Sequence, residues 1–293
     1  MTSRPQPRSG LPTRVTSQPL ASSHVVRPSG TTTRERAAPE PEEIYAEARR
    51  EGRRRLSRPL RELAATALVG GFDVAFGVAV YSLAAGAVDT RTSSQLAHLV
   101  GAAAFGIGFV FVVVGRSELF TENFLVPVAG LERRRGSWLK LGELWVGTFL
   151  LNLIGGTLLA IILTSKGVLS GSSHVAVTSL AEHLGHYSAA SGFLSAVVAG
   201  ALMTLMTWFV EGAAQSMSVR IVMSWIVGAV IVLGTFNHAI VSTIEIVFGM
   251  RYGAHVTLGE LFTNLGIAVG GNLVGGLLLV TFARSAQAGG GSS

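Results

Sequence analysis

The chain has 293 residues, of which 49% are apolar and only 14% are charged, and its formal net charge is +6. This composition excludes an ordinary soluble domain and indicates a membrane protein with several spanning helices. The excess arginine lies in the N-terminal region and in loops, where membrane topology explains it, so we expect no nucleic-acid partner. Because the chain has no cysteine, disulfides, thiolate chemistry and cysteine metal sites are excluded.

The N-terminal region divides into two segments. Residues 1–39 are rich in Ser, Thr, Pro and Arg and lack apolar periodicity, which predicts a disordered basic tail. No apolar signal-peptide core follows the positive start; an organelle transit peptide is the alternative. Residues 40–58 place glutamates before arginines, as the helix dipole favours, and predict a cytoplasmic amphipathic helix. Either its arginines lie near anionic headgroups of the inner membrane surface, or the helix is merely solvated.

Residues 59–284 contain six hydrophobic segments of about the length that a bilayer requires. They cover residues 60–85, 96–131, 138–163, 191–213, 221–248 and 258–283. We therefore predict an all-α membrane domain with six transmembrane helices over 59–284, followed by a flexible C-terminal tail at 285–293.

Polar residues interrupt the second and fifth segments. Residues 115–123 read GRSELFTEN and place three charges where a spanning helix should continue, and the second break, near 234–238, contains His238. Backbone leaves the helical conformation inside a bilayer only where protein buries it or where it lines a cavity, and such broken helices mark transporters and channels. The pattern predicts a polar constriction in a permeation path. The alternative is a re-entrant or interfacial loop with only a structural role.

The third and sixth segments carry the same motif, NLIGG from Asn152 and NLVGG from Asn272. Two halves of three segments each, in opposite orientation, form the inverted-repeat plan of transporters. Lys and Arg gather on one side of the six segments: Arg49 to Arg61, Arg133, Arg134, Arg135, Lys140, Arg220 and Arg284. The positive-inside rule therefore places both termini in the cytoplasm of a cell with an inner or plasma membrane.

Four motifs in this order resemble the formate/nitrite transporter family, of which the chain would be a divergent member. SELFTEN at 117–123 is similar to the family's S/A-E/D-L-F-T-x-N signature in broken helix two, and FNH at 236–238 to its F-E-H motif in broken helix five. NLIGG at 152–156 and GNLVGG at 271–276 are similar to its G-N-L-I-G motifs. The resemblance covers about residues 58–283. It implies an aquaporin-like fold, a homopentamer with one pore in each protomer, and transport of small monovalent anions, often with a proton, without cofactor or metal.

The resemblance also implies roles for individual residues. The expected inner constriction consists of Leu119, Phe120 and Thr121 with Phe109 across from it, and the outer one of Phe105 and Ile231. His238, preceded by Asn237, would lie between them and hydrogen-bond to Thr121 or to the permeant anion. In this arrangement Thr121 would fix the imidazole tautomer.

Four positions depart from the family pattern. Leu184 stands where a lysine is usual, Gly200 where an asparagine is usual, Asn237 replaces a glutamate, and Ser242 replaces an asparagine. These departures indicate altered selectivity or a different gate.

Other polar residues are expected to have structural roles. We interpret His174, His183 and His186 as solvated loop residues that add positive charge only at acid pH. Arg116 is expected to pair with Glu118 or Glu122. The acids Asp73, Glu143, Glu211 and Glu245 are expected to be paired structurally or at an interface.

The sequence thus predicts a channel or transporter for small anions, with or without proton coupling through His238, and no enzyme. Two alternatives stay open: a membrane scaffold or sensor that acts through its basic N-terminal tail, and a channel for neutral solutes. A scaffold has no need of a histidine at a helix break, which favours transport.

Overall fold

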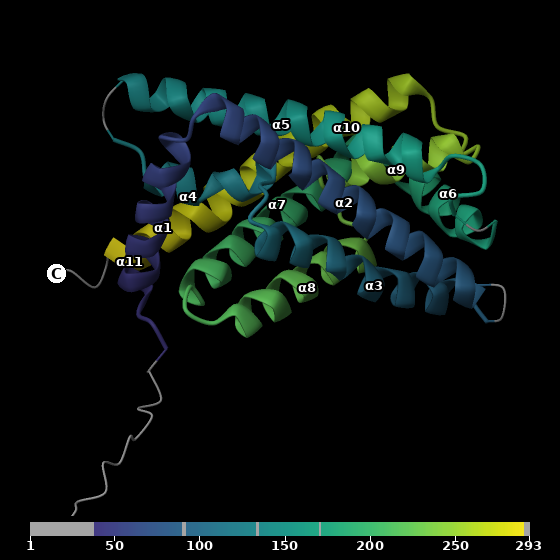
Figure 1. Cartoon of the computed structure of the whole chain (residues 1–293), viewed down its shortest axis with the longest axis horizontal. Coiled ribbons are helices and arrows are strands. Elements are labelled where there is room, and N and C mark those ends of the chain that lie inside the picture. The colour runs from purple at the N-terminus through teal and green to yellow at the C-terminus, as the bar shows by residue number, and fades with distance from the viewer. Residues whose placement is uncertain (1–37, 90–91, 133–134, 170, 290–293) are drawn as a thin grey trace, which may run out of the picture. The chain divides into compact units, whose positions relative to one another are not determined.

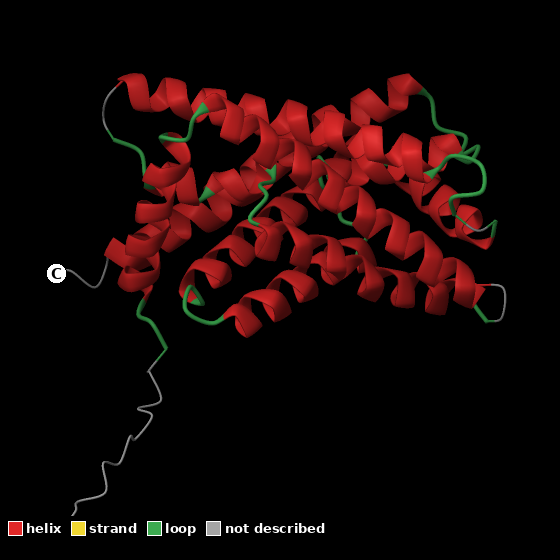
Figure 2. Cartoon of the chain, viewed as in Figure 1, coloured by secondary structure: helices red, strands yellow, loops and turns green. Residues whose placement is uncertain are grey.

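The computed structural model describes residues 38–89, 92–132, 135–169 and 171–289, so nearly all of the predicted tail at 1–39 lies outside the described residues. The chain divides after Ala38, and the second unit holds every element below. The described residues are helical and contain no strand (Figure 2). In chain order the elements are α1 (Pro41–Leu56), α2 (Leu60–Asp89), α3 (Ser94–Gly115), η1 (Phe120–Phe124), α4 (Val126–Ala129), α5 (Arg135–Leu163), α6 (Ser172–Gly185), α7 (Ala189–Gly212), α8 (Met217–Leu233), α9 (Val241–Arg251), α10 (Leu258–Leu273), η2 (Val274–Thr281) and α11 (Phe282–Gly289).

The six-segment plan and its two broken helices are confirmed. Among the described residues, α2, α3, α5, α7 and the continuous run from α10 to α11 are long and apolar enough to span a membrane, and α8 is apolar but shorter. The second segment is split into α3, η1 and α4, and the fifth into α8 and α9. Helix α11 extends to Gly289, into the segment predicted as a flexible tail.

Helix α6 is not predicted by the sequence, and it places His174 and His183 on a helix instead of in a loop, while His183 and His186 are exposed as expected. It packs against α9 and α2 and carries His174 and His183, while His186 caps its C-terminus. The His174 ring stacks on Tyr252 with 3.7 Å between centroids. His183 Nε2 lies 3.2 Å from the hydroxyl of Tyr187.

The two halves are built alike. Helix α2 packs against α3 and α5, and α7 packs against α8 and α10 (Figure 1). A Cβ atom on Gly71 would overlap the backbone oxygen of Asn152, and a Cβ on Gly200 would overlap that of Asn272. A Cβ atom on Gly155 would likewise overlap the backbone oxygen of Leu68, and one on Gly275 would overlap that of Val197. These matching backbone contacts are the structural form of the inverted repeat, and they require glycine.

Side chains of each half also pack against glycines of the other half. A Cβ atom on Gly156 of α5 would meet the side chain of Ile244 from α9, and one on Gly276 of η2 would meet that of Phe124 from η1. Each half therefore leaves space on its third helix for a residue of the other half's broken helix.

We expect Gly200→Ala to lower the free energy of unfolding by about 2 kcal/mol, because the added methyl group would enter the backbone of Asn272, which has no room to yield. Thermal unfolding in detergent measures the change. Gly266→Ala is the matched control, since nothing lies within 4 Å of its Cβ position. Alanine there should stabilise α10 by roughly 0.5–1 kcal/mol. Equal melting temperatures for the two variants would refute the packing argument.

Helix α1 packs against protein instead of standing alone. Its residues Ala48 and Gly52 are buried, and Gly52 approaches the backbone of Gly130 at the end of α4. Helix α1 also contacts α7 and α11. The sequence predicts a helix at residues 40–58 either on the membrane surface or in solvent. Neither interpretation includes a face that is buried against the rest of the protein.

Candidate permeation site

A hydrogen bond between the two broken helices forms the centre of the site. Thr121 Oγ1, in η1, lies 2.8 Å from Nε2 of His238, in the break between α8 and α9. Both residues are fully buried. This is the contact that the family resemblance implied, whereas the roles of both residues in a pore stay predictions.

The tautomer of His238 is set by α9 and not, as expected, by Thr121. The backbone N–H groups of Ile240 and Val241 lie 3.3 and 3.1 Å from Nδ1, which must therefore accept. Nε2 then carries the proton and donates to Thr121, whose own hydroxyl proton is left to point elsewhere. A neutral imidazole can thus polarise the Thr121 hydroxyl.

Asn152 of α5 holds the first break. Its Oδ1 accepts from the N–H of Phe120 at 2.8 Å, and its Nδ2 donates to the carbonyl oxygens of Ala67 and Glu118 at 2.7 and 2.9 Å. Unpaired backbone groups are costly inside a membrane, so this buried amide compensates for the missing helix turn.

Asn272 does the same for the second break. Its Oδ1 accepts from the N–H of Ala239 at 2.9 Å, and its Nδ2 donates to the carbonyl oxygens of Ala196 and Asn237 at 2.8 and 3.0 Å. The asparagine of the repeated motif therefore has the same local function in both halves, which is to bond to backbone groups of a broken helix.

Apolar side chains enclose the central hydrogen bond. The ring of Phe109 lies 6.3 Å from that of His238, and Phe105 packs edge-on against Phe109 with 5.6 Å between centroids. The remaining predicted constriction residues, Leu119, Phe120 and Ile231, are at most 5% exposed. The structure thus brings the predicted site residues into one buried region, and their assignment to constrictions stays a prediction.

Each departure from the family pattern has a structural setting. Asn237 exchanges two hydrogen bonds with Asn264, at 2.7 and 3.1 Å, so a neutral amide pair occupies this position. Ser242 Oγ accepts from the N–H of His238 at 3.0 Å. Gly200 lies against Asn272, and Leu184 is buried in the apolar core.

A pocket that we name the outer pocket, after the orientation that the sequence predicts, contains His98 and Thr235, which the sequence did not single out. It has a volume of about 280 Å³ and is lined in part by His98, His183 and Thr235. His98 bridges the hydroxyl of Tyr81, at 2.9 Å, and the carbonyl oxygen of Leu233, at 3.1 Å. His98 lies on the same face of α3 as Phe105 and Phe109, and this helical spacing in the sequence could have identified it.

The backbone at Thr235 is strained. Its φ is 50°, a conformation that a β-branched residue rarely adopts, and the carbonyl oxygen accepts from the Tyr187 hydroxyl at 2.9 Å. The N–H of Phe236 bonds to the carbonyl oxygen of Ile231, which closes α8 in a Schellman motif where glycine is usual. Strain of this kind is typical of functional positions.

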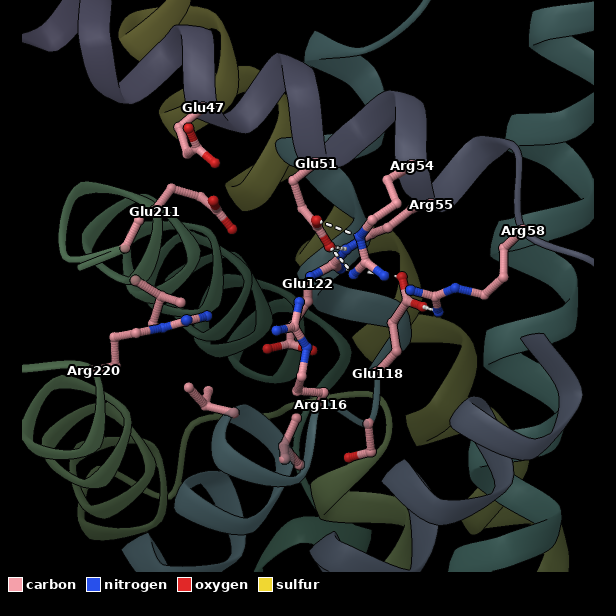
Figure 3. A pocket seen from close by; sticks show the side chains of 15 residues that line it. Glu47, Glu51, Arg54, Arg55, Arg58, Arg116, Glu118, Glu122, Glu211 and Arg220 are labelled. Atoms are coloured by element: carbon pink, nitrogen blue, oxygen red, sulfur yellow. Dashed lines mark hydrogen bonds and ion pairs between the residues drawn. The ribbon is translucent and has the colours of Figure 1, made fainter. Parts of the chain in front are cut away.

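A second pocket, of about 230 Å³, lies beside the first break (Figure 3), and we name it the inner pocket after the same predicted orientation. Arginines and glutamates of α1, of the break and of the α7–α8 region line it. The expected pairing of Arg116 with Glu118 or Glu122 is wrong. Arg116 is exposed, and its φ of 57° ends α3, whereas Glu118 pairs with Arg55 of α1 and with Arg58, which lies between α1 and α2.

The four acids differ in their partners. Asp73 accepts a hydrogen bond from Ser117 at 2.5 Å, and Glu143 pairs with Lys140 at 2.6 Å, as expected. Glu211 lines the inner pocket. One buried carboxylate oxygen of Glu245 has no hydrogen-bond partner, which departs from the expected pairing. Among the described residues no cluster of three His, Asp or Glu could hold a metal ion.

Two half-helices that meet at a buried histidine, between an inner and an outer pocket, define a multi-pass membrane transporter or channel and not an enzyme. The chain matches the formate/nitrite transporter family model over residues 42–286, and it belongs to that family.

Relatives and solved structures agree with this assignment. The chain is 27% identical to the uncharacterized transporter YrhG of Bacillus subtilis, over 82% of this chain and 90% of the relative. It is 24% identical to the formate channel BtFdhC of Bacillus thuringiensis, over 83% and 93%. A pentameric formate channel with formate bound shares the fold, with a TM-score of 0.66 and 20% identity over 78% of this chain and 96% of that one.

Proposed function

We propose that the protein conducts small monovalent anions of weak acids, such as formate or nitrite, through one pore in each protomer of a homopentamer. The observation that carries the proposal is the Thr121–His238 hydrogen bond, which joins the two broken helices at the buried centre. The formate channel that shares the fold is pentameric, and its assembly supports the same state for this chain.

The site is suited to a lone monovalent ion. Moving a bare anion into an apolar constriction carries a large desolvation cost, which neutralisation of a weak acid removes. The fixed tautomer favours His238 as a neutral donor through Thr121. In the proton-coupled form of the proposal, the anion is protonated by water-borne protons before it reaches the centre, and His238 then orients the neutral acid.

The direction of insertion follows the basic side chains. With both termini in the cytoplasm of an inner or plasma membrane, α1 and the inner pocket face the cell interior, and the His98 pocket faces outward. The lipid bilayer is then the protein's surroundings along the exposed apolar faces of α2, α5 and α10.

Purified protein in proteoliposomes tests the proposal. Formate, nitrite, lactate, hydrosulfide and glycerol are supplied at two external pH values, with protein-free vesicles as the control. We expect fast entry of formate and nitrite and background entry of glycerol. Faster formate entry at the lower pH, with acidification of the lumen, would establish proton coupling.

The same panel decides between the alternatives. Background rates for every anion, together with a binding partner that is lost on removing residues 1–55, would replace transport by a scaffold function. Entry of glycerol at the rate of formate would show a neutral-solute channel.

A further inference from the structure

Helix α1 places an arginine against the loop of the first break. Arg55 lies near the end of α1, its side chain is only 13% exposed, and it points toward Glu118 (Figure 3). Nη1 of Arg55 donates to Glu118 Oε1 and to Asn123 Oδ1, both at 3.0 Å. Glu118 and Asn123 stand on either side of the Leu119–Thr121 segment, so one guanidinium holds both ends of that segment.

The position of Arg55 is itself fixed. Glu51, one turn earlier, bonds to its Nε at 3.2 Å and to Arg54 at 2.5 and 2.6 Å. Burial alone would raise the pKa of Glu51, but the hydrogen bonds and charges of Arg54 and Arg55 lower it to about 2. The carboxylate therefore stays ionised at any working pH and keeps the guanidinium in place.

Close backbone packing makes α1 a rigid support. Gly52, three residues before Arg55, approaches Gly130 so closely that a Cβ on either residue would meet the other's backbone. Because α4 follows directly after η1, α1 is attached to the same half-helix whose first turn carries Thr121. The loop is thus held by Asn152 from α5 and by Arg55 from α1.

We propose that Arg55 is a positioning residue that sets the width of the inner constriction, so that α1 belongs to the permeation machinery. This inference rests on the proposed transport function. Without the guanidinium, Asn123 Oδ1 loses its donor and the Glu118 carboxylate keeps only Arg58. The segment between them is then still bonded to Asn152 but is held less tightly at both ends, so its distance from His238 can change.

The test compares Arg55→Ala, Arg55→Lys and the control Arg49→Ala, an exposed arginine of the same helix. Initial rates of formate and of the larger anion acetate are measured in proteoliposomes. We expect Arg55→Ala to raise the acetate-to-formate rate ratio about tenfold, a change on the scale of one charge-assisted hydrogen bond. Arg55→Lys keeps the charge but not the paired donors of the guanidinium, so its acetate-to-formate ratio should lie between those of the wild type and Arg55→Ala. Arg49→Ala should match the wild type.

The melting temperature and assembly state of each variant are measured in parallel. A purely structural role would lower both rates in proportion and leave the ratio unchanged, which would overturn the inference. If Arg55→Ala does not assemble, the ratio of Arg55→Lys alone decides. A ratio equal to that of the wild type in this variant would likewise overturn the inference. Failure of the wild type to conduct either anion would instead reject the proposed function.

Discussion

Replacement of His238 by alanine is expected to reduce the formate rate by about 10- to 100-fold, because the pore centre would lose a hydrogen-bond donor in a desolvated setting. The N–H groups of Ile240 and Val241, which now bond to Nδ1, would also lose their acceptor. Stopped-flow measurement of formate entry into proteoliposomes gives the rate, and size-exclusion chromatography gives the assembly state.

Thr121 supplies a matched pair for this experiment. Thr121→Val keeps the shape of the side chain and removes the hydroxyl, whereas Thr121→Ser keeps the hydroxyl that Nε2 of His238 contacts at 2.8 Å. We expect the valine variant to fall toward the His238→Ala rate and the serine variant to stay near the wild type. Unchanged flux in both His238→Ala and Thr121→Val would remove the central observation behind the proposed function.

The second large effect is expected at the repeated asparagines. Asn152→Leu keeps the branched shape of the side chain but is larger, and it leaves the N–H of Phe120 and the carbonyl oxygen of Glu118 without these bonds, whereas Ala67 keeps its bond within α2. At about 1–3 kcal/mol for each of the two buried groups, with overpacking added, we expect a loss of roughly 3 kcal/mol or more in the free energy of unfolding. Thermal or denaturant unfolding in detergent measures it.

Asn272→Leu is the internal replicate, since Asn272 makes the same three kinds of hydrogen bond in the other half. Its loss should be similar. Ser165→Ala, at the exposed end of the Asn152 helix, removes one hydroxyl bond to Ile161 and should change stability little. A large difference between the two asparagine variants would show that the two breaks are not equivalent.

Hydrophobic length and internal repetition made most of the fold predictable. Six apolar segments, two polar interruptions and two NLxGG motifs are local patterns, and each reports on a single element. The contact of Thr121 with His238 came from the family motifs and not from spacing, since 117 residues separate them.

The features that could not be predicted depend on tertiary contact. Helix α6 is short and mixes histidine and serine with apolar residues, so it has no spanning signal. Arg116 is near Glu118 in sequence and lines the same pocket, but the carboxylate pairs with Arg55, which only the tertiary packing of α1 brings close. From the sequence alone we interpret Gly200 as a sign of altered selectivity or a different gate, whereas the backbone of Asn272 occupies the space that a side chain would need.

The packing of side chains from each half against glycines of the other half has a consequence for biosynthesis. Gly156 lies against Ile244, and Gly276 lies against Phe124. The third span therefore lacks one packing partner until the fifth span is made, and Phe124 lacks its own until the sixth is made. Chains usually complete N-terminal units first during synthesis. In this protein the packing of the first half is complete only after the last helix is made.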